Sequence, residues 1–274
     1  MEQLLYEYNS THAQFCGLAL ANGIQLPSYD NESKRYFILT PRGSATWDSD
    51  RNDTWDKNFG KFVSQELRNV LDDVQGRIAA LQTTDEGLDE YFSCMANPSL
   101  ILTLANGTKI WQCSSDGVSK FGIDTLNPVR VCLGASPKIQ GNFHHIDLND
   151  GYPMMINPSL TPDQFKSFIS TLEKVLIATT HPNQNIIINC SQGQSRSGLF
   201  VICLLMHLAR RRQITQKMTE TIPLNYSIQT TDSNRLLCSV YSFVNFKRVT
   251  VHVNPKFIPF MVFMAENIHS SYLN

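Results

Sequence analysis

The chain has 274 residues, enough for one large domain or two small ones, and its 42% hydrophobic and 17% charged content is that of a globular protein. The net charge of -1 gives no reason to expect a nucleic-acid partner or an anionic membrane surface. No run of about 18 apolar residues occurs, so we expect no membrane span. The seven scattered cysteines include no CxxC pair and therefore predict neither a disulfide framework nor a zinc site.

The first part of the chain is polar and then gives way to a helix and a hairpin. Residues 1 to about 55 are rich in loop signals, so we predict irregular structure there, either an N-terminal extension or a part of the main fold. Residues 61–82 have apolar positions at helical spacing and predict a helix. Strands are predicted at 100–104 and 108–113, because Asn106-Gly107 between them favours a tight hairpin turn.

Helices and strands alternate through the second half. Thr161 and Pro162 are typical of the N-cap and first residue of a helix, which we place over 161–178. Three isoleucines at 186–188 predict a strand buried on both faces. The other predicted strands are 129–133, 143–146 and 249–253, and the other predicted helices are 197–212, 234–246 and 255–268. This order predicts an α/β protein with a mixed central sheet flanked by helices.

The segment IIINCSQGQSRSG, residues 186–198, carries the main functional signal. A loop between a strand and a helix N-terminus turns backbone N–H groups inward and makes a cradle for an anion. Gly193 lets the backbone approach a phosphate, and the planar guanidinium of Arg196 can grip two of its oxygens. Cys190 lies at the floor of this cradle, where the helix dipole and Arg196 favour thiolate over thiol. A thiolate below a bound phosphate is placed for in-line attack.

This segment resembles the active-site loop of the protein tyrosine phosphatase family, whose pattern is His-Cys-x-x-Gly-x-x-Arg-Ser/Thr-Gly. The residues that match are Cys190, Gly193, Arg196, Ser197 and Gly198. The resemblance implies a cysteinyl-phosphate intermediate, whose breakdown the Ser197 hydroxyl would assist. The family's histidine is Asn189 here, so the activation of the thiolate is expected to be weaker or different.

A general acid must protonate the leaving oxygen of a phosphate ester. Residues 144–155, HHIDLNDGYPMM, resemble the family's mobile acid loop, which implies that Asp150 is the acid. The alternative is that Asp150 is a turn residue, since Asn-Asp-Gly is common turn chemistry. Asp147 is the second candidate acid, and Asp163 is interpreted as first-turn charge of a helix.

Further candidates line the phosphate pocket. The resemblance implies substrate contacts from the uncharged loop residues, from Tyr36 as a wall for the substrate ring, and from Asn254 in place of a water-positioning glutamine. For Tyr36 and Asn254 the alternatives are a half-buried strand aromatic and a residue that simply precedes a helix. The loop residues concerned are Ser191, Gln192, Gly193, Gln194 and Ser195.

The sequence therefore predicts a phosphatase-like catalytic domain over 56–274 that hydrolyses phosphomonoesters, with phosphotyrosine in proteins as the preferred substrate. Alternatives are a phosphate-binding pseudophosphatase, a dual-specificity or phosphoinositide phosphatase, and a rhodanese-like sulfur carrier or arsenate reductase. No metal and no cofactor are expected. The expected partner is a phosphorylated protein, and the expected location is the cytoplasm, either the cell's own or that of a host into which the protein is delivered.

Overall fold

The structure is a computed structural model that describes residues 1–10, 28–30, 35–40, 43–48, 63–121, 128–134, 143–148, 160–214, 228–254 and 257–268. For 28–30, 35–40, 43–48 and residue 143 it describes the backbone alone. Within these ranges no helix combines the length and the apolar character needed to cross a bilayer.

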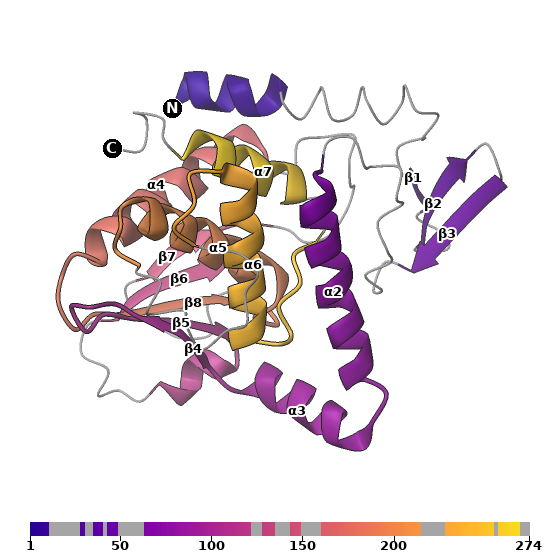
Figure 1. The fold of residues 1–274 in the computed structure, drawn as a ribbon, viewed down its shortest axis with the longest axis horizontal. Helices are drawn as coiled ribbons and strands as arrows, with labels where there is room; N and C mark the ends of the chain where they lie inside the picture. Colours follow the sequence, from indigo (N-terminus) through magenta and orange to yellow (C-terminus); the bar gives the residue numbers. More distant parts are fainter. Residues whose placement is uncertain are drawn as a thin grey trace.

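A five-stranded mixed sheet forms the centre of the fold (Figure 1). Its order is β4-β5-β8-β6-β7, with β4 antiparallel to β5 and the other neighbours parallel. The predicted α/β class with a mixed sheet is confirmed, and β8 occupies the middle of the sheet, where ligand sites of parallel sheets form at the carboxyl ends. The strands are β4 (Ser99–Thr103), β5 (Lys109–Ser114), β6 (Val129–Leu133), β7 (Phe143–Ile146) and β8 (Asn185–Cys190).

Helices cover the sheet and bury its apolar residues. Within the core, α5 packs against β5, β6 and β8, while α4 packs against β6 and β7. Figure 1 shows α4, α5 and α7 together above the sheet and α6 beside them, next to α2. The helices are α2 (Gln65–Leu81), α3 (Asp85–Ala96), α4 (Pro162–Ala178), α5 (Ser195–Arg210), α6 (Ser233–Lys247) and α7 (Ile258–Asn267), with a 3-10 turn, η2 (Gly117–Lys120).

The N-terminal residues are structured where we expected irregular chain. Residues 2–10 form a helix, and its Leu4 and Tyr8 are fully buried. The Tyr8 ring lies 5.4 Å from that of Phe165 and 5.4 Å from that of Phe260, which ties this helix to α4 and α7. A separate antiparallel sheet has the order β1 (Ser28–Asp30), β2 (Arg35–Thr40), β3 (Gly43–Asp48). The expectation of irregular structure is therefore wrong in these stretches.

The strand predicted at 249–253 is also wrong. Its alternating valines favour a strand, but residues 249–250 form a turn, and residues 251–254 pair with no strand that the structure describes. Side chains of α6 satisfy this backbone instead. The Asn245 amide donates to the Val251 carbonyl at 2.9 Å, and the Tyr241 hydroxyl accepts from the Val253 N–H at 2.9 Å.

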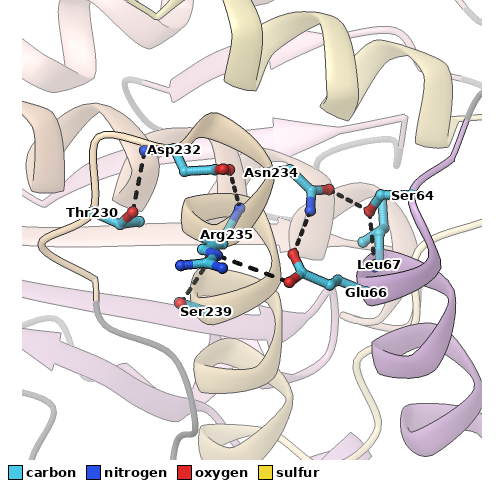
Figure 2. A network of polar contacts seen from close by, with 8 residues as sticks. All are labelled: Ser64, Glu66, Leu67, Thr230, Asp232, Asn234, Arg235 and Ser239. Carbon is cyan, nitrogen blue, oxygen red and sulfur yellow. Dashed lines mark hydrogen bonds and ion pairs between the residues drawn. The ribbon is translucent and has the colours of Figure 1, made fainter.

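A polar network joins the N-terminal ends of α2 and α6 (Figure 2). Ser64 caps α2 by accepting from the Leu67 N–H at 3.1 Å, and its hydroxyl donates to Asn234 Oδ1 at 2.6 Å. The Asn234 amide in turn donates to Glu66 at 2.8 Å. Arg235 lies 3.8 Å from the same carboxylate with its side chain 61% exposed, so this outer ion pair contributes little.

Candidate active site

Cys190 is the last residue of β8, and strand alternation sets the direction of its side chain. Ile188 and Cys190 face the main core beneath α5, whereas Ile187 faces a smaller cluster on the other side of the sheet. The strand is therefore buried on both faces, as predicted. By the same alternation Asn189 points away from the Cys190 side, and its amide lies 3.6 Å from the Cys132 sulfur of β6.

The residues after Cys190 form the predicted loop between strand and helix. The Ser191 carbonyl accepts from the Ser115 N–H at 3.1 Å, which fixes the start of the loop against the end of β5. Gly193 has φ 70, a conformation that strains any other L-residue. Ser191 and Gln192 are exposed. Helix α5 begins at Ser195, two residues earlier than predicted, so Arg196 lies in its first turn.

Ser197 lies beside the sulfur. Its Oγ is 3.3 Å from Cys190 Sγ and accepts from the Gln112 amide of β5 at 3.0 Å. The same amide donates to the Gly193 carbonyl at 3.1 Å, and a carbonyl can only accept, so the nitrogen must face this side. Because Ser197 accepts from Gln112, its hydroxyl hydrogen is available for a hydrogen bond to the sulfur.

Arg196 is held against the ends of β6 and β7. Its Nη1 donates to the Leu148 carbonyl at 3.0 Å. Gly134, with φ 64, lies so close that a Cβ there would collide with both that carbonyl and the Arg196 guanidinium. The guanidinium is thus held beside the Leu148 carbonyl and Gly134, and Arg196 itself lies in the first turn of α5.

The predicted general acid cannot be placed in the same way. Asp150 lies outside the described residues, although Leu148, two positions before it, contacts Arg196. Asp147, the second candidate, is exposed, and its backbone carbonyl accepts from the Gln164 amide at 2.6 Å. Asp163 lies in the first turn of α4, as interpreted from the sequence.

Of the two predicted substrate contacts outside the loop, the structure locates the backbone of Asn254 near the loop but does not describe the side chain of Tyr36. The Asn254 N–H donates to Ser195 Oγ at 3.0 Å, so this residue does lie against the loop. Tyr36 is in β2, and its side chain lies outside what the structure describes. The Tyr91 hydroxyl of α3, which we did not predict, accepts from the Gln194 amide at 2.9 Å.

Two further contacts to the loop were missed in the sequence. They come from Gln112 of β5 and from Arg248 at the end of α6, and both side chains are completely buried. Arg248 Nε donates to the Gly193 carbonyl at 2.8 Å. A polar residue at an inward position of a buried strand was a signal for Gln112, whereas the sequence around Arg248 gave none.

The other thiols differ from Cys190 in their surroundings. Burial raises the pKa of Cys113 to about 12, although the charge of Arg248 acts in the opposite direction. Burial likewise raises the pKa of Cys238 to about 12 and that of Cys203 beyond its ordinary value. These three are therefore protonated at neutral pH and behave as small apolar residues. The six cysteines in the described ranges form no disulfide with one another, and Cys16 lies outside those ranges.

Comparison with known proteins bears on the same segment. The protein-tyrosine phosphatase family model matches residues 157–229, about a quarter of the chain. This stretch contains α4, β8, the loop after Cys190 and α5, and it begins after Asp150. No curated protein matches the chain. The matched stretch, which holds β8, the loop after Cys190 and the N-terminus of α5, is therefore similar to the corresponding part of the protein-tyrosine phosphatase family.

Proposed function

We propose that the protein is a metal-independent phosphomonoester hydrolase that acts through a cysteinyl-phosphate intermediate. The observation that carries this proposal is the placement of Cys190 Sγ 3.3 Å from the Ser197 hydroxyl, beside the first turn of α5 that holds Arg196. One nucleophile, one hydrogen-bond donor to it and one phosphate clamp thus meet at the N-terminus of a buried helix.

In the first step the Cys190 thiolate attacks phosphorus, and the bond from phosphorus to the ester oxygen breaks. Arg196 and the loop amides hold the equatorial oxygens, and Asp150 gives its proton to the leaving oxygen. In the second step water attacks phosphorus and the phosphorus–sulfur bond breaks. Asp150 takes a proton from that water, the Ser197 hydroxyl stabilises the departing thiolate, and Asn254 helps to orient the water. Phosphate leaves with the enzyme restored.

Phosphotyrosine in a protein is our proposed substrate. Within the loop, Ser191 and Gln192 are exposed and uncharged, whereas an inositol ring with several phosphates calls for cations at such positions. Tyr36 is proposed as a wall for the tyrosine ring. A thiolate nucleophile needs a reducing compartment, which supports a cytoplasmic site of action. Dual specificity is the alternative for the same site.

A second candidate function is that of a phosphate-binding pseudophosphatase. Asn189 favours it, because this residue stands where the family has histidine and its amide is directed at Cys132. In this case the loop binds phosphate, but the cysteinyl-phosphate forms or breaks down too slowly for turnover. Asn189→His should then raise turnover above that of the wild type. Equal turnover of the wild type and Asn189→His would contradict the argument from Asn189 for a pseudophosphatase.

The deciding experiment is hydrolysis of p-nitrophenyl phosphate and of a panel of phosphopeptides by the wild type and by Cys190→Ser. We expect turnover that the substitution abolishes, with phosphotyrosine peptides preferred over phosphoserine peptides. Asp150→Asn should lower turnover by roughly 10²–10⁴-fold if this residue is the acid. Activity that survives Cys190→Ser, or none in the wild type while phosphate still binds, contradicts the hydrolase.

A further inference from the structure

Arg248 is a charged side chain where none is expected. Its exposed fraction is 0%, and arginine is almost never fully buried unless it is paired with an acid. Its three hydrogen bonds within the described part of the chain all go to neutral oxygens. Nε donates to the Gly193 carbonyl at 2.8 Å, and Nη1 donates to the Asn97 carbonyl at 2.9 Å and to Ser99 Oγ at 3.0 Å.

The positive charge has no carboxylate to balance it in the described part of the chain. Burial lowers the pKa of Arg248, and the groups that oppose this are three cysteines: Cys94, Cys113 and Cys190. Nη2 is buried and has no hydrogen-bond partner among the described residues. A buried cation without a paired anion is destabilising, and no carboxylate among the described residues supplies that anion.

Of the three thiols, Cys190 is the one suited to become that anion. Burial raises the pKa of Cys113 to about 12, so Cys113 is neutral across the working range. Cys94 is half-buried in α3, and its sulfur lies 3.5 Å from the Thr250 hydroxyl. Among these three thiols, Cys190 is the one that lies beside the first turn of α5, with its sulfur 3.3 Å from the Ser197 hydroxyl. Cys190 is also one of the groups whose charge interacts with that of Arg248.

The contact to Gly193 also has a consequence for the anion cradle. The peptide group is planar and trans, so the Gly193 carbonyl and the Gln194 N–H point in opposite directions. Arg248 and Gln112 both donate to this carbonyl, at 2.8 and 3.1 Å. These two hydrogen bonds use both lone pairs of the oxygen and hold the carbonyl pointing toward the two donors. The Gln194 N–H is thereby directed to the other side, where the loop must offer donors to an anion.

We propose that Arg248 is a positioning residue of the phosphatase loop, which aims the loop amides through the Gly193 carbonyl and supplies the buried positive charge that favours the thiolate of Cys190. This inference rests on the proposed chemistry of that loop. It adds to the proposed phosphate clamp Arg196 a second cation that contacts the loop, at the Gly193 carbonyl.

The test measures Cys190 itself and does not need turnover. Iodoacetamide alkylation near pH 6, read by mass spectrometry at Cys190, reports the thiolate population, and protection by inorganic phosphate reports the cradle. Arg248→Met removes the charge at similar volume, and Arg248→Lys keeps the charge but loses the fork. The control is Arg235→Met, the same change on the same helix at an exposed side chain.

We expect Arg248→Met to slow the alkylation at least about tenfold and to weaken phosphate protection by a similar factor. Arg248→Lys should keep alkylation near the wild-type rate while phosphate protection falls. Arg235→Met should match the wild type in both. Alkylation and protection in Arg248→Met that equal those of the control would overturn the inference.

Two controls show whether a loss of reactivity comes from misfolding or from an error in the proposed function. Circular dichroism and gel filtration check each variant, and Ser99→Ala, which removes one acceptor of Nη1 at a half-buried position, serves if both Arg248 variants fail to fold. Ser99→Ala should weaken phosphate protection with alkylation unchanged, and wild-type protection would contradict the positioning role. A wild type that does not hydrolyse p-nitrophenyl phosphate, but whose Cys190 reactivity still depends on Arg248, would contradict the proposed function and leave this inference standing.

Discussion

Replacing Gly193 by alanine should damage both the stability of the protein and its phosphate site, and the structure allows the effect to be estimated. The φ of 70 places residue 193 in the left-handed region, which costs an alanine about 1–2 kcal/mol. A Cβ there would also lie 2.5 Å from the Ser114 nitrogen and 2.6 Å from the Cys113 carbonyl oxygen. Ordinary contacts need about 3.5 Å, so the loop must retreat from β5 by roughly 1 Å.

That retreat adds about 1–3 kcal/mol of overpacking, and together with the backbone strain we expect a loss of about 3 kcal/mol in the free energy of unfolding. A shift of about 1 Å at a reacting group commonly lowers turnover about 10²-fold, so p-nitrophenyl phosphate hydrolysis should fall by that order. Urea denaturation gives the first quantity, and phosphate protection of Cys190 from alkylation gives an independent view of the second.

Gly76 provides a matched control, because it lies in α2 and a Cβ there would meet nothing within 4 Å. The same Gly→Ala change at this helix interior should stabilise the protein by about 0.5–1 kcal/mol and leave the phosphate site unchanged. The two substitutions are thus expected to have opposite signs. A Gly193→Ala protein within about 0.5 kcal/mol of wild type, with normal phosphate protection, would refute the reasoning.

Three further predictions concern other parts of the fold. Ser197→Ala should slow the alkylation of Cys190 about tenfold through loss of the hydroxyl 3.3 Å from its sulfur, and an unchanged rate would argue against that hydrogen bond. Burial lowers the pKa of His207 from 6.5 to about 4, so the unfolded chain binds more protons between these values and stability should fall by on the order of 3 kcal/mol as pH falls through this window. His207→Met should flatten that fall in urea titrations, and an equally steep fall would exclude His207 as its source. Thr161→Ala should remove about 1 kcal/mol by breaking the capping box of α4, and Thr161→Ser should restore most of it.

Local signals predicted the elements that carry the site. The strands at 129–133 and 143–146 have the predicted bounds, and Thr161 caps α4 as its sequence indicated. The order of strand, loop and helix around Cys190 was predicted because a buried isoleucine run, a glycine and an apolar helix stand next to one another in the chain.

What could not be predicted depends on contacts between distant segments. Arg248 reaches a loop 55 positions earlier, and nothing in its neighbours marks it as buried. Helix α3 has Gly87 as its one buried residue, so it lacks the apolar stripe by which helices are found in sequence. The valines at 249–253 have the period of a strand, but the side chains of α6 satisfy their backbone in place of a neighbouring strand.

The alternation of side chains along β8 limits where residues can be inserted into or deleted from this part of the sequence. Cys190 and Asn189 lie on opposite sides of the sheet because one residue separates them in an extended strand. Deleting or inserting a single residue within 185–190 would exchange their sides and direct the thiol toward Cys132. Insertions or deletions ahead of Asn185, in the turn around residues 180–184, do not change which residues of β8 face each side of the sheet. Insertions and deletions should therefore be tolerated in that turn and be absent from the strand in any related protein that keeps Cys190 on the α5 side of the sheet.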